Sequence, residues 1–98
     1  MKPEEAKTKM ENNANIILLD VRSKKEYDEK HIPNSILIPL KNLEDEIESK
    51  IKDKDSEIIV YCRSGRRSKS ACKKLANLGY KNVYNLDGGI KKWKYEIE

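Results

Sequence analysis

The sequence predicts an α/β fold, with a small, mostly parallel β-sheet flanked by helices on both faces. Short apolar runs that suit buried strands alternate with amphipathic segments of about ten residues that suit helices. Such strand–helix units connect through right-handed crossovers, which place neighbouring strands parallel. The 98 residues suffice for one modest core but not for two. We therefore expect a single domain over residues 1–98.

The first third of the chain predicts helices on either side of a buried strand. Pro3 is followed by two acidic residues, a combination typical of a first helical turn, and this helix is expected to reach about residue 12. Residues 16–21 (IILLDV) form an apolar, β-branched run that predicts a strand buried on both faces. Ser23 and Glu26 fit a capping box, which opens a short helix ending near residue 30.

The remaining elements continue the alternation. A short strand is expected over residues 35–38, and apolar residues spaced by three, four and four predict an amphipathic helix over 40–51. Residues 58–61 are typical of a central parallel strand, and the next helix is expected to begin near Arg67 or Ser68. The last expected elements are a helix stop at Gly79, a strand over 82–86, a tight turn at Gly88 and Gly89, and a helical turn over 90–93.

Composition excludes several classes of function. Lysines are scattered and interleaved with acids, and no basic stripe alternates with aromatics, so the net charge of +4 does not indicate a nucleic-acid partner. No apolar run is long enough to span a membrane, and no secretory signal opens the chain, so a cytoplasmic location is expected. Two cysteines and one histidine are too few for a zinc site. We expect no metal, no cofactor, no disulfide and a monomer.

One segment, YCRSGRRS at residues 61–68, concentrates chemistry around a thiol. It holds three of the four arginines of the chain in the five residues after Cys62. Cys62 ends a predicted central strand, and sites in parallel sheets form outside the carboxyl ends of strands. Gly65 allows the loop to curl so that backbone N–H groups point inward as an anion-binding nest. The nest, the helix N-terminus and the positive side chains of Arg63, Arg66 and Arg67 favour a thiolate.

These features predict that Cys62 is a nucleophile and that the arginines bind an anionic substrate. The planar guanidinium of arginine binds tetrahedral oxyanions through two hydrogen bonds and stays charged. An ionised thiol that attacks a good leaving group requires no general base. Ser64 is either a hydrogen-bond donor to bound sulfur or a plain loop residue, and the sequence leaves both interpretations open.

Two long segments resemble the rhodanese sulfurtransferases. LLDVRSKKEYDEKHIPNSILIP (18–39) is similar to the first motif of that family, and VYCRSGRRSKSACKKLANLGYKNVYNLDGGIKKW (60–93) to its active-site loop, helix and closing Gly-Gly-x-x-x-Trp element. The resemblance implies a rhodanese-like fold and a persulfide on Cys62. That persulfide would form from a small anionic sulfane donor such as thiosulfate, release sulfite and pass sulfur to cyanide or a thiol. It also implies that the loop of Arg63, Ser64, Gly65, Arg66 and Arg67 cradles the persulfide.

Two positions depart from the family pattern, which often has glycine at both. Asn34 tolerates a left-handed backbone conformation, whereas Lys30 would incur a cost of about 1 kcal/mol there. Neither residue touches the predicted chemistry, so we expect altered local turn geometry rather than altered activity.

Two other functions compete with this interpretation. The chain could be a sulfur carrier or interaction module that a partner protein, such as a cysteine desulfurase, loads with sulfur. It could also be a cysteine phosphatase or arsenate reductase, but phosphatase loops place arginine six positions after cysteine. Here Arg67 lies five positions after Cys62 and position 68 is serine, so the cradle is one residue shorter and suits a single sulfur better.

Five further residues receive structural interpretations. Cys72 shares the apolar face of its helix and is expected to be buried rather than to resolve a disulfide with Cys62. His31 is expected to stabilise a turn by a hydrogen bond. Asp20 and Arg22 are expected to hold the first motif against the loop through an ion pair or hydrogen bonds. Trp93 is expected to close a small core.

Overall fold

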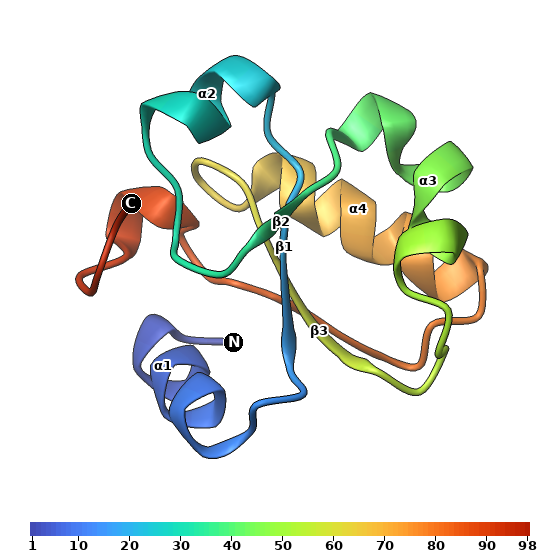
Figure 1. Cartoon of the computed structure of the whole chain (residues 1–98), viewed down its shortest axis with the longest axis horizontal. Helices are drawn as coiled ribbons and strands as arrows, with labels where there is room; N and C mark the ends of the chain where they lie inside the picture. The colour runs from blue at the N-terminus through green and yellow to red at the C-terminus, as the bar shows by residue number, and fades with distance from the viewer.

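A four-stranded parallel sheet organises the computed structural model, which describes all of residues 1–98 (Figure 1). The sheet has the order β2-β1-β3-β4, and each neighbouring pair is parallel. Its strands are β1 (Ile17–Asp20), β2 (Ile36–Leu37), β3 (Glu57–Tyr61) and β4 (Asn82–Asn85). The helices are α1 (Pro3–Asn12), α2 (Lys24–Glu29), α3 (Leu43–Lys50) and α4 (Arg66–Asn77), with 3-10 turns η1 (Leu40–Asn42) and η2 (Ile90–Lys92). The predicted α/β class is confirmed.

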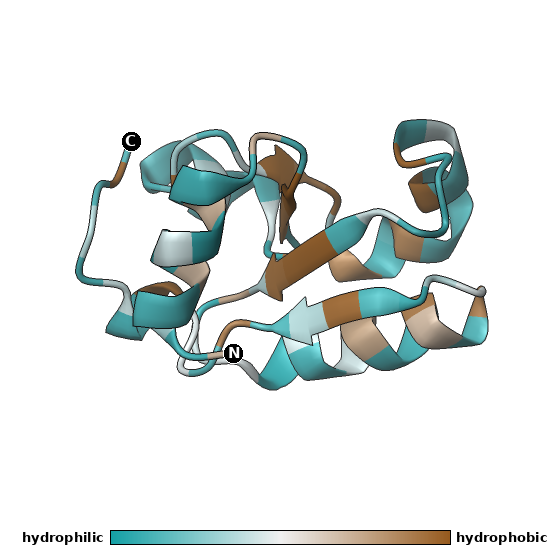
Figure 2. Ribbon diagram, turned by 90° about the horizontal axis from the view of Figure 1, so that it is seen from below, coloured by the Kyte–Doolittle hydropathy of each residue, from teal (hydrophilic) through white to brown (hydrophobic).

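The central strands are buried on both faces, as their continuous apolar runs predict. Leu19 and Val60 face a core that includes residues of α3 and α4, whereas Leu18 and Ile59 face a second core with α1 and the C-terminal segment. In Figure 1, α3 and α4 lie together on one side and α1 lies apart from them. Figure 2 shows apolar residues gathered on the strands, while much of the helical surface is hydrophilic. None of the helices has the length and apolar character needed to cross a bilayer.

The local expectations for the helices are confirmed, with small shifts at their ends. Ser23 and Glu26 form the predicted capping box at the start of α2. The helix expected over 40–51 is instead a 3-10 turn followed by α3, because the Leu40 N–H bonds to the carbonyl of Val21 and ties the first turn to the end of β1. α4 begins at Arg66, slightly earlier than expected.

The expected backbone cost at Lys30 was wrong. Lys30 has φ −169°, which is extended backbone that any side chain adopts, so no strain arises there. Asn34 has φ 68° and is the only residue other than glycine in the left-handed region, in agreement with its tolerance for that conformation.

Candidate active site

Cys62 occupies the position that the sequence predicts, directly after central strand β3. Only three residues separate it from the start of α4 at Arg66. Gly65 closes this loop with φ 103°, a conformation that suits glycine, and accepts the first hydrogen bond of α4 from the N–H of Lys69. The Cys62 side chain is buried, with 1% of the residue exposed. The thiol therefore lies at the N-terminus of a twelve-residue helix.

The sulfur of Cys62 is surrounded by hydrogen-bond donors from its own loop and from α4. The backbone N–H of Gly65 donates to Sγ at 3.1 Å, and that of Ser68 at 3.4 Å. The hydroxyl of Ser68 lies 3.5 Å from Sγ. A sulfur held by several N–H groups at a helix N-terminus is in an environment that favours negative charge.

Hydrogen bonds to the sulfur favour the thiolate form of Cys62, and the charge of Arg67 interacts with it as well. Burial raises the pKa of Cys62, but hydrogen bonds from the Ser68 hydroxyl and from the N–H groups of Ser68, Gly65 and Ser64 outweigh it, so the pKa lies below its ordinary value. The side chain of Ser64 is exposed and forms no hydrogen bond, while its backbone N–H contributes to the lowered pKa of Cys62; a hydrogen bond from Ser64 to bound sulfur stays a prediction. The nest, the helix N-terminus and the arginines were all expected to favour the thiolate, and of these the N–H groups make direct hydrogen bonds to the sulfur.

Ser68 is a site residue that the sequence interpretation missed. It was treated only as the residue that replaces the arginine of phosphatase loops. One signal could have found it: Ser68 precedes Ala71 and Leu75 by three and seven residues, so it lies on the buried face of α4. A serine at that position in a first helical turn brings a hydroxyl toward the residue that precedes the helix.

The three arginines of the loop have different roles. Arg67 donates to both carboxylate oxygens of Glu26, at 2.8 Å each, so its guanidinium is engaged in a bidentate ion pair. Arg63 and Arg66 are exposed and form no ion pair. The side chain of Arg67 thus joins α4 to α2, and only Arg63 and Arg66 present free guanidinium groups; binding of an anionic substrate by the three arginines stays a prediction.

We expect Glu26→Gln to destabilise the protein by about 1 kcal/mol at neutral pH. The effect is no larger because the ion pair is partly exposed and solvent screens its charges. The hydrogen bonds from Arg67, against the opposing effect of burial, hold the pKa of Glu26 at about 2, below its ordinary value of 4.5. The stabilisation is therefore present above pH 4.5 and is lost as the pH falls toward 2. Urea unfolding at neutral and acidic pH measures the difference.

The control for this variant is Asp28→Asn on the same helix, because the Asp28 carboxylate pairs with Lys24 and both side chains are largely exposed. This control should change stability by less than about 0.5 kcal/mol. A loss for Glu26→Gln that persists unchanged at acidic pH would contradict the role assigned to its charge.

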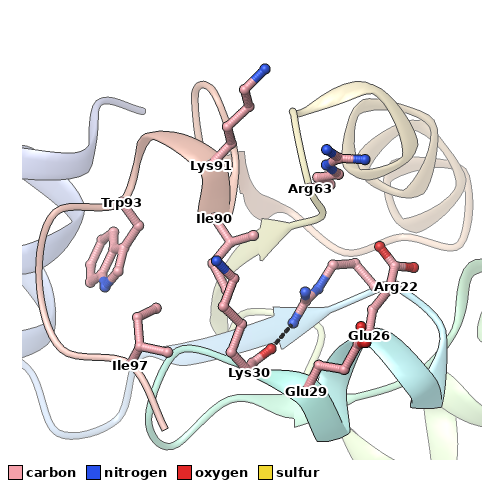
Figure 3. Close-up of a pocket in the computed structure, with 9 residues that line it drawn as sticks. All are labelled: Arg22, Glu26, Glu29, Lys30, Arg63, Ile90, Lys91, Trp93 and Ile97. Carbon is pink, nitrogen blue, oxygen red and sulfur yellow. Dashed lines mark hydrogen bonds between the residues drawn. The ribbon is translucent and has the colours of Figure 1, made fainter.

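A pocket of about 590 Å³ opens beside the loop (Figure 3). η2 and the C-terminal segment supply the apolar lining together with one lysine, and the loop and the region around α2 supply both cationic and acidic side chains. Ile97 is 41% exposed and is the only large hydrophobic residue so exposed. The lining residues are Arg22, Glu26, Glu29, Lys30, Arg63, Ile90, Lys91, Trp93 and Ile97.

The expected ion pair of Asp20 with Arg22 and the expected turn hydrogen bond of His31 are confirmed, and both lie within the first motif itself. Arg22 donates to Asp20 Oδ2 at 2.7 Å and to the carbonyl of Lys30 at 2.7 Å, and both partners of the ion pair are almost fully buried. His31 Nδ1 bonds to the carbonyl of Tyr27 at 2.8 Å, and the two rings stack. This motif thus fixes one side of the pocket.

Cys72 and Trp93 are also structural. Cys72 is a free thiol that packs against the core of α3 and α4, and burial raises its pKa to about 11. Trp93 is 8% exposed and closes the second core. The expected burial is confirmed for Trp93, whereas Cys72 is only partly buried.

The Gly88–Gly89 turn packs against the backbone of the loop at residues 62 and 63, a role that the sequence did not reveal. Beyond it, the N–H of Ile90 donates to the carbonyl of Cys62 at 2.9 Å, and the N–H of Lys91 to that of Arg63 at 3.0 Å. A Cβ atom on Gly89 would lie 2.5 Å from both of those carbonyl oxygens. Only glycine at this position lets the two backbone segments approach so closely.

Together these features define a small α/β domain whose activated cysteine lies at the carboxyl end of a central parallel strand. Comparison with protein families gives the rhodanese-like domain, whose model matches residues 2–96. The chain belongs to the rhodanese-like domain family. Its resemblance to that family is thus confirmed.

Individual relatives agree with this assignment. The chain is 37% identical over 79 residues to thiosulfate sulfurtransferase GlpE of Coxiella burnetii, with 81% of this chain and 72% of that protein covered. It is 36% identical over 102 residues to adenylyltransferase and sulfurtransferase UBA4 of Candida albicans, where the match covers 98% of this chain and 23% of that protein. It therefore spans under a quarter of the length of UBA4.

Solved structures also support membership of the rhodanese-like family. A rhodanese-related protein of Thermoplasma volcanium is similar over 100% of this chain and 95% of its own, with a TM-score of 0.86 and 30% sequence identity. The family and its relatives support sulfurtransferase activity in general for this chain.

Proposed function

We propose that the protein moves a sulfane sulfur from thiosulfate or a similar anionic donor to a thiophilic acceptor, cyanide or a thiol, through a persulfide on Cys62. The observation that carries the proposal is the buried sulfur of Cys62, which accepts N–H hydrogen bonds from Gly65 and Ser68 at a helix N-terminus. These donors stabilise an anionic sulfur without a general base. A cytoplasmic location and a monomeric state stay predictions.

The reaction divides into two displacements. In the first, the Cys62 thiolate attacks the sulfane sulfur of thiosulfate; the new S–S bond forms as the old one breaks, and sulfite leaves with the electron pair. In the second, cyanide attacks the outer sulfur of the persulfide, thiocyanate leaves, and the thiolate of Cys62 is restored. No external oxidant or reductant is required, because the sulfane sulfur that thiosulfate gives up in the first step is the sulfur that cyanide takes up in the second.

The geometry supports this proposal over a phosphatase or arsenate reductase. In the phosphatase loop, an arginine six positions after the cysteine clamps the phosphoryl oxygens. Here that position is Ser68, and the nearest arginine, Arg67, is held by both oxygens of Glu26. We infer that the loop lacks the bidentate clamp that a phosphoryl group needs.

The free arginines at the rim predict how an anionic donor binds. We expect Arg63→Gln and Arg66→Gln each to raise the KM for thiosulfate by about threefold with little change in kcat, since an exposed charge pair contributes well under 1.5 kcal/mol. The effect should shrink at high ionic strength. Thiocyanate formation from thiosulfate and cyanide, followed over a series of donor concentrations, measures it.

The matched control is Lys52→Gln, an exposed cation on the turn after α3 and outside the pocket, which should leave the KM unchanged. A wild-type protein that forms no thiocyanate with any small sulfane donor would contradict the proposed function. Hydrolysis of a phosphate ester that disappears in Cys62→Ser would instead revive the phosphatase alternative.

A protein donor or acceptor is a second candidate partner, in line with a sulfur-carrier role. The pocket beside the loop has a volume far larger than thiosulfate, and its lining combines the exposed Ile97 with four cationic and two acidic side chains. Such a surface suits a chain segment with an acidic group next to an apolar side chain. Transfer of labelled sulfur from a cysteine desulfurase to Cys62 at low protein concentration would support this role, and lack of transfer would remove it.

A further inference from the structure

The hydroxyl group of Ser68 lies between two atoms that compete for its single proton. One is Cys62 Sγ at 3.5 Å, and the other is the side-chain oxygen Oδ1 of Asn85 at 2.5 Å. While Cys62 is a thiol it carries its own proton, and the amide oxygen of Asn85 can only accept a hydrogen bond, so in this state the hydroxyl proton of Ser68 points toward Asn85 and away from the sulfur.

The orientation of the Asn85 amide is fixed by a second contact. Its Nδ2 group donates to the carbonyl of Gly65 at 3.3 Å. A reversed amide would place its oxygen against that carbonyl, where no proton is available to either. Asn85 ends β4 in register with Val60 of β3, so the sheet itself places the amide beside the loop.

The two protonation states of Cys62 make different demands on this chain of hydrogen bonds. The thiol can donate its proton to Ser68 Oγ while Ser68 donates to Asn85, so every group is satisfied. A thiolate can only accept, so Ser68 must turn its proton to the sulfur and leave Asn85 Oδ1 without a donor. The N–H groups of Gly65 and Ser68 face the sulfur in either state. Ionisation therefore breaks one hydrogen bond at Asn85.

We propose that Asn85 is a positioning residue that restrains the ionisation of Cys62 by holding the hydroxyl proton of Ser68. Ser68 and Asn85 thus act in opposite directions on the same thiol. A resting protein kept partly as the thiol reacts more slowly with oxidants, because oxidation proceeds from the thiolate. This inference rests on the proposed role of Cys62 as the nucleophile.

Other charges near the loop are the same in every variant used to test this inference, so they cancel in the comparison. They come from the loop and α4, from the end of β1, from α2 and from the β4–η2 region. They are Arg63, Arg66, Arg67, Asp20, Arg22, Glu26, Asp87, Lys91 and the N-terminal ammonium group of Met1, which donates to the carbonyl of Asn85.

The test is the rate at which iodoacetamide alkylates Cys62 over a pH series, read by mass spectrometry of the Cys62 peptide. Below the pKa, Ser68→Ala should lower the thiolate fraction about tenfold, and Asn85→Leu should raise it about threefold. In the double variant, Asn85→Leu should have no effect relative to Ser68→Ala alone. A lower thiolate fraction in Asn85→Leu, no change, or the same rise in the Ser68→Ala background would overturn the proposal.

A measurement on the unaltered protein covers the case in which Asn85→Leu does not fold. The carbon-13 shift of the Asn85 side-chain carbonyl should show an inflection at the pH where Cys62 ionises, because Oδ1 loses its donor there. A shift that stays flat through that ionisation would overturn the proposal. Neither measurement uses a sulfur donor, so the inference can fail while sulfur transfer stands, and sulfur transfer can fail while the inference stands.

Discussion

Cys62→Ser is expected to lower sulfur transfer by more than about a thousandfold and to leave the fold intact. A serine hydroxyl does not ionise at neutral pH and cannot take up the sulfane sulfur as a thiolate does. The smaller oxygen can still accept from the N–H groups of Gly65 and Ser68 that now face the sulfur. Thiocyanate formation and thermal unfolding, measured on the same preparation, test both parts of this expectation.

Cys72→Ala is the matched control for the loss of a thiol. Cys72 lies against the core, and burial raises its pKa to about 11, so at neutral pH it is almost wholly protonated. We expect activity within about twofold of the original and a stability loss of about 1 kcal/mol. Loss of transfer in Cys72→Ala comparable to that in Cys62→Ser would show that the second thiol takes part in the reaction.

Gly89→Ala is expected to reduce activity by about a hundredfold and stability by about 3 kcal/mol. Gly89 has φ 60° and ψ −157°, a region almost restricted to glycine. Its new methyl group would lie 2.5 Å from the carbonyl oxygens of Cys62 and Arg63, which are backbone atoms with little freedom to move. The loop must shift and the N–H donors must leave the sulfur. Steady-state kinetics and urea unfolding measure the two effects.

Gly79→Ala is a control that separates the steric clash expected in Gly89→Ala from the cost of placing alanine in a left-handed backbone conformation. Gly79 has φ 95°, but a Cβ atom there meets nothing within 4 Å. We expect a stability loss of about 1 kcal/mol and unchanged activity. Equal activity losses in the two alanine variants would contradict the view that Gly89 supports the catalytic loop.

Local sequence was enough to predict the fold and the position of the nucleophile. The capping box of Ser23 and Glu26 and the continuous apolar run before Cys62 each depend on neighbours within a few residues. Such signals survive in any tertiary context that buries the same faces. One wrong expectation, strain at Lys30, came from assigning a backbone conformation by family pattern where the chain takes an extended one.

Contacts between distant segments could not be predicted in the same way. The ion pair of Arg67 with Glu26 joins residues 41 positions apart. The close approach of Gly89 to Cys62 depends on how the segment after β4 packs against the loop. The sequence shows three arginines after a cysteine, but only the packed structure shows that one is engaged by a carboxylate. Hydrogen bonds to the sulfur from Ser68 likewise depend on where α4 begins.

The most direct test of a persulfide on Cys62 is the intact mass of the protein after treatment with thiosulfate, beside Cys62→Ser and a sample washed with reductant. The proposed mechanism predicts a gain of one sulfur atom on the original protein, its removal by the reductant and no gain on the variant. An equal gain on Cys62→Ser, or no gain with thiosulfate or any other sulfane donor, would contradict it.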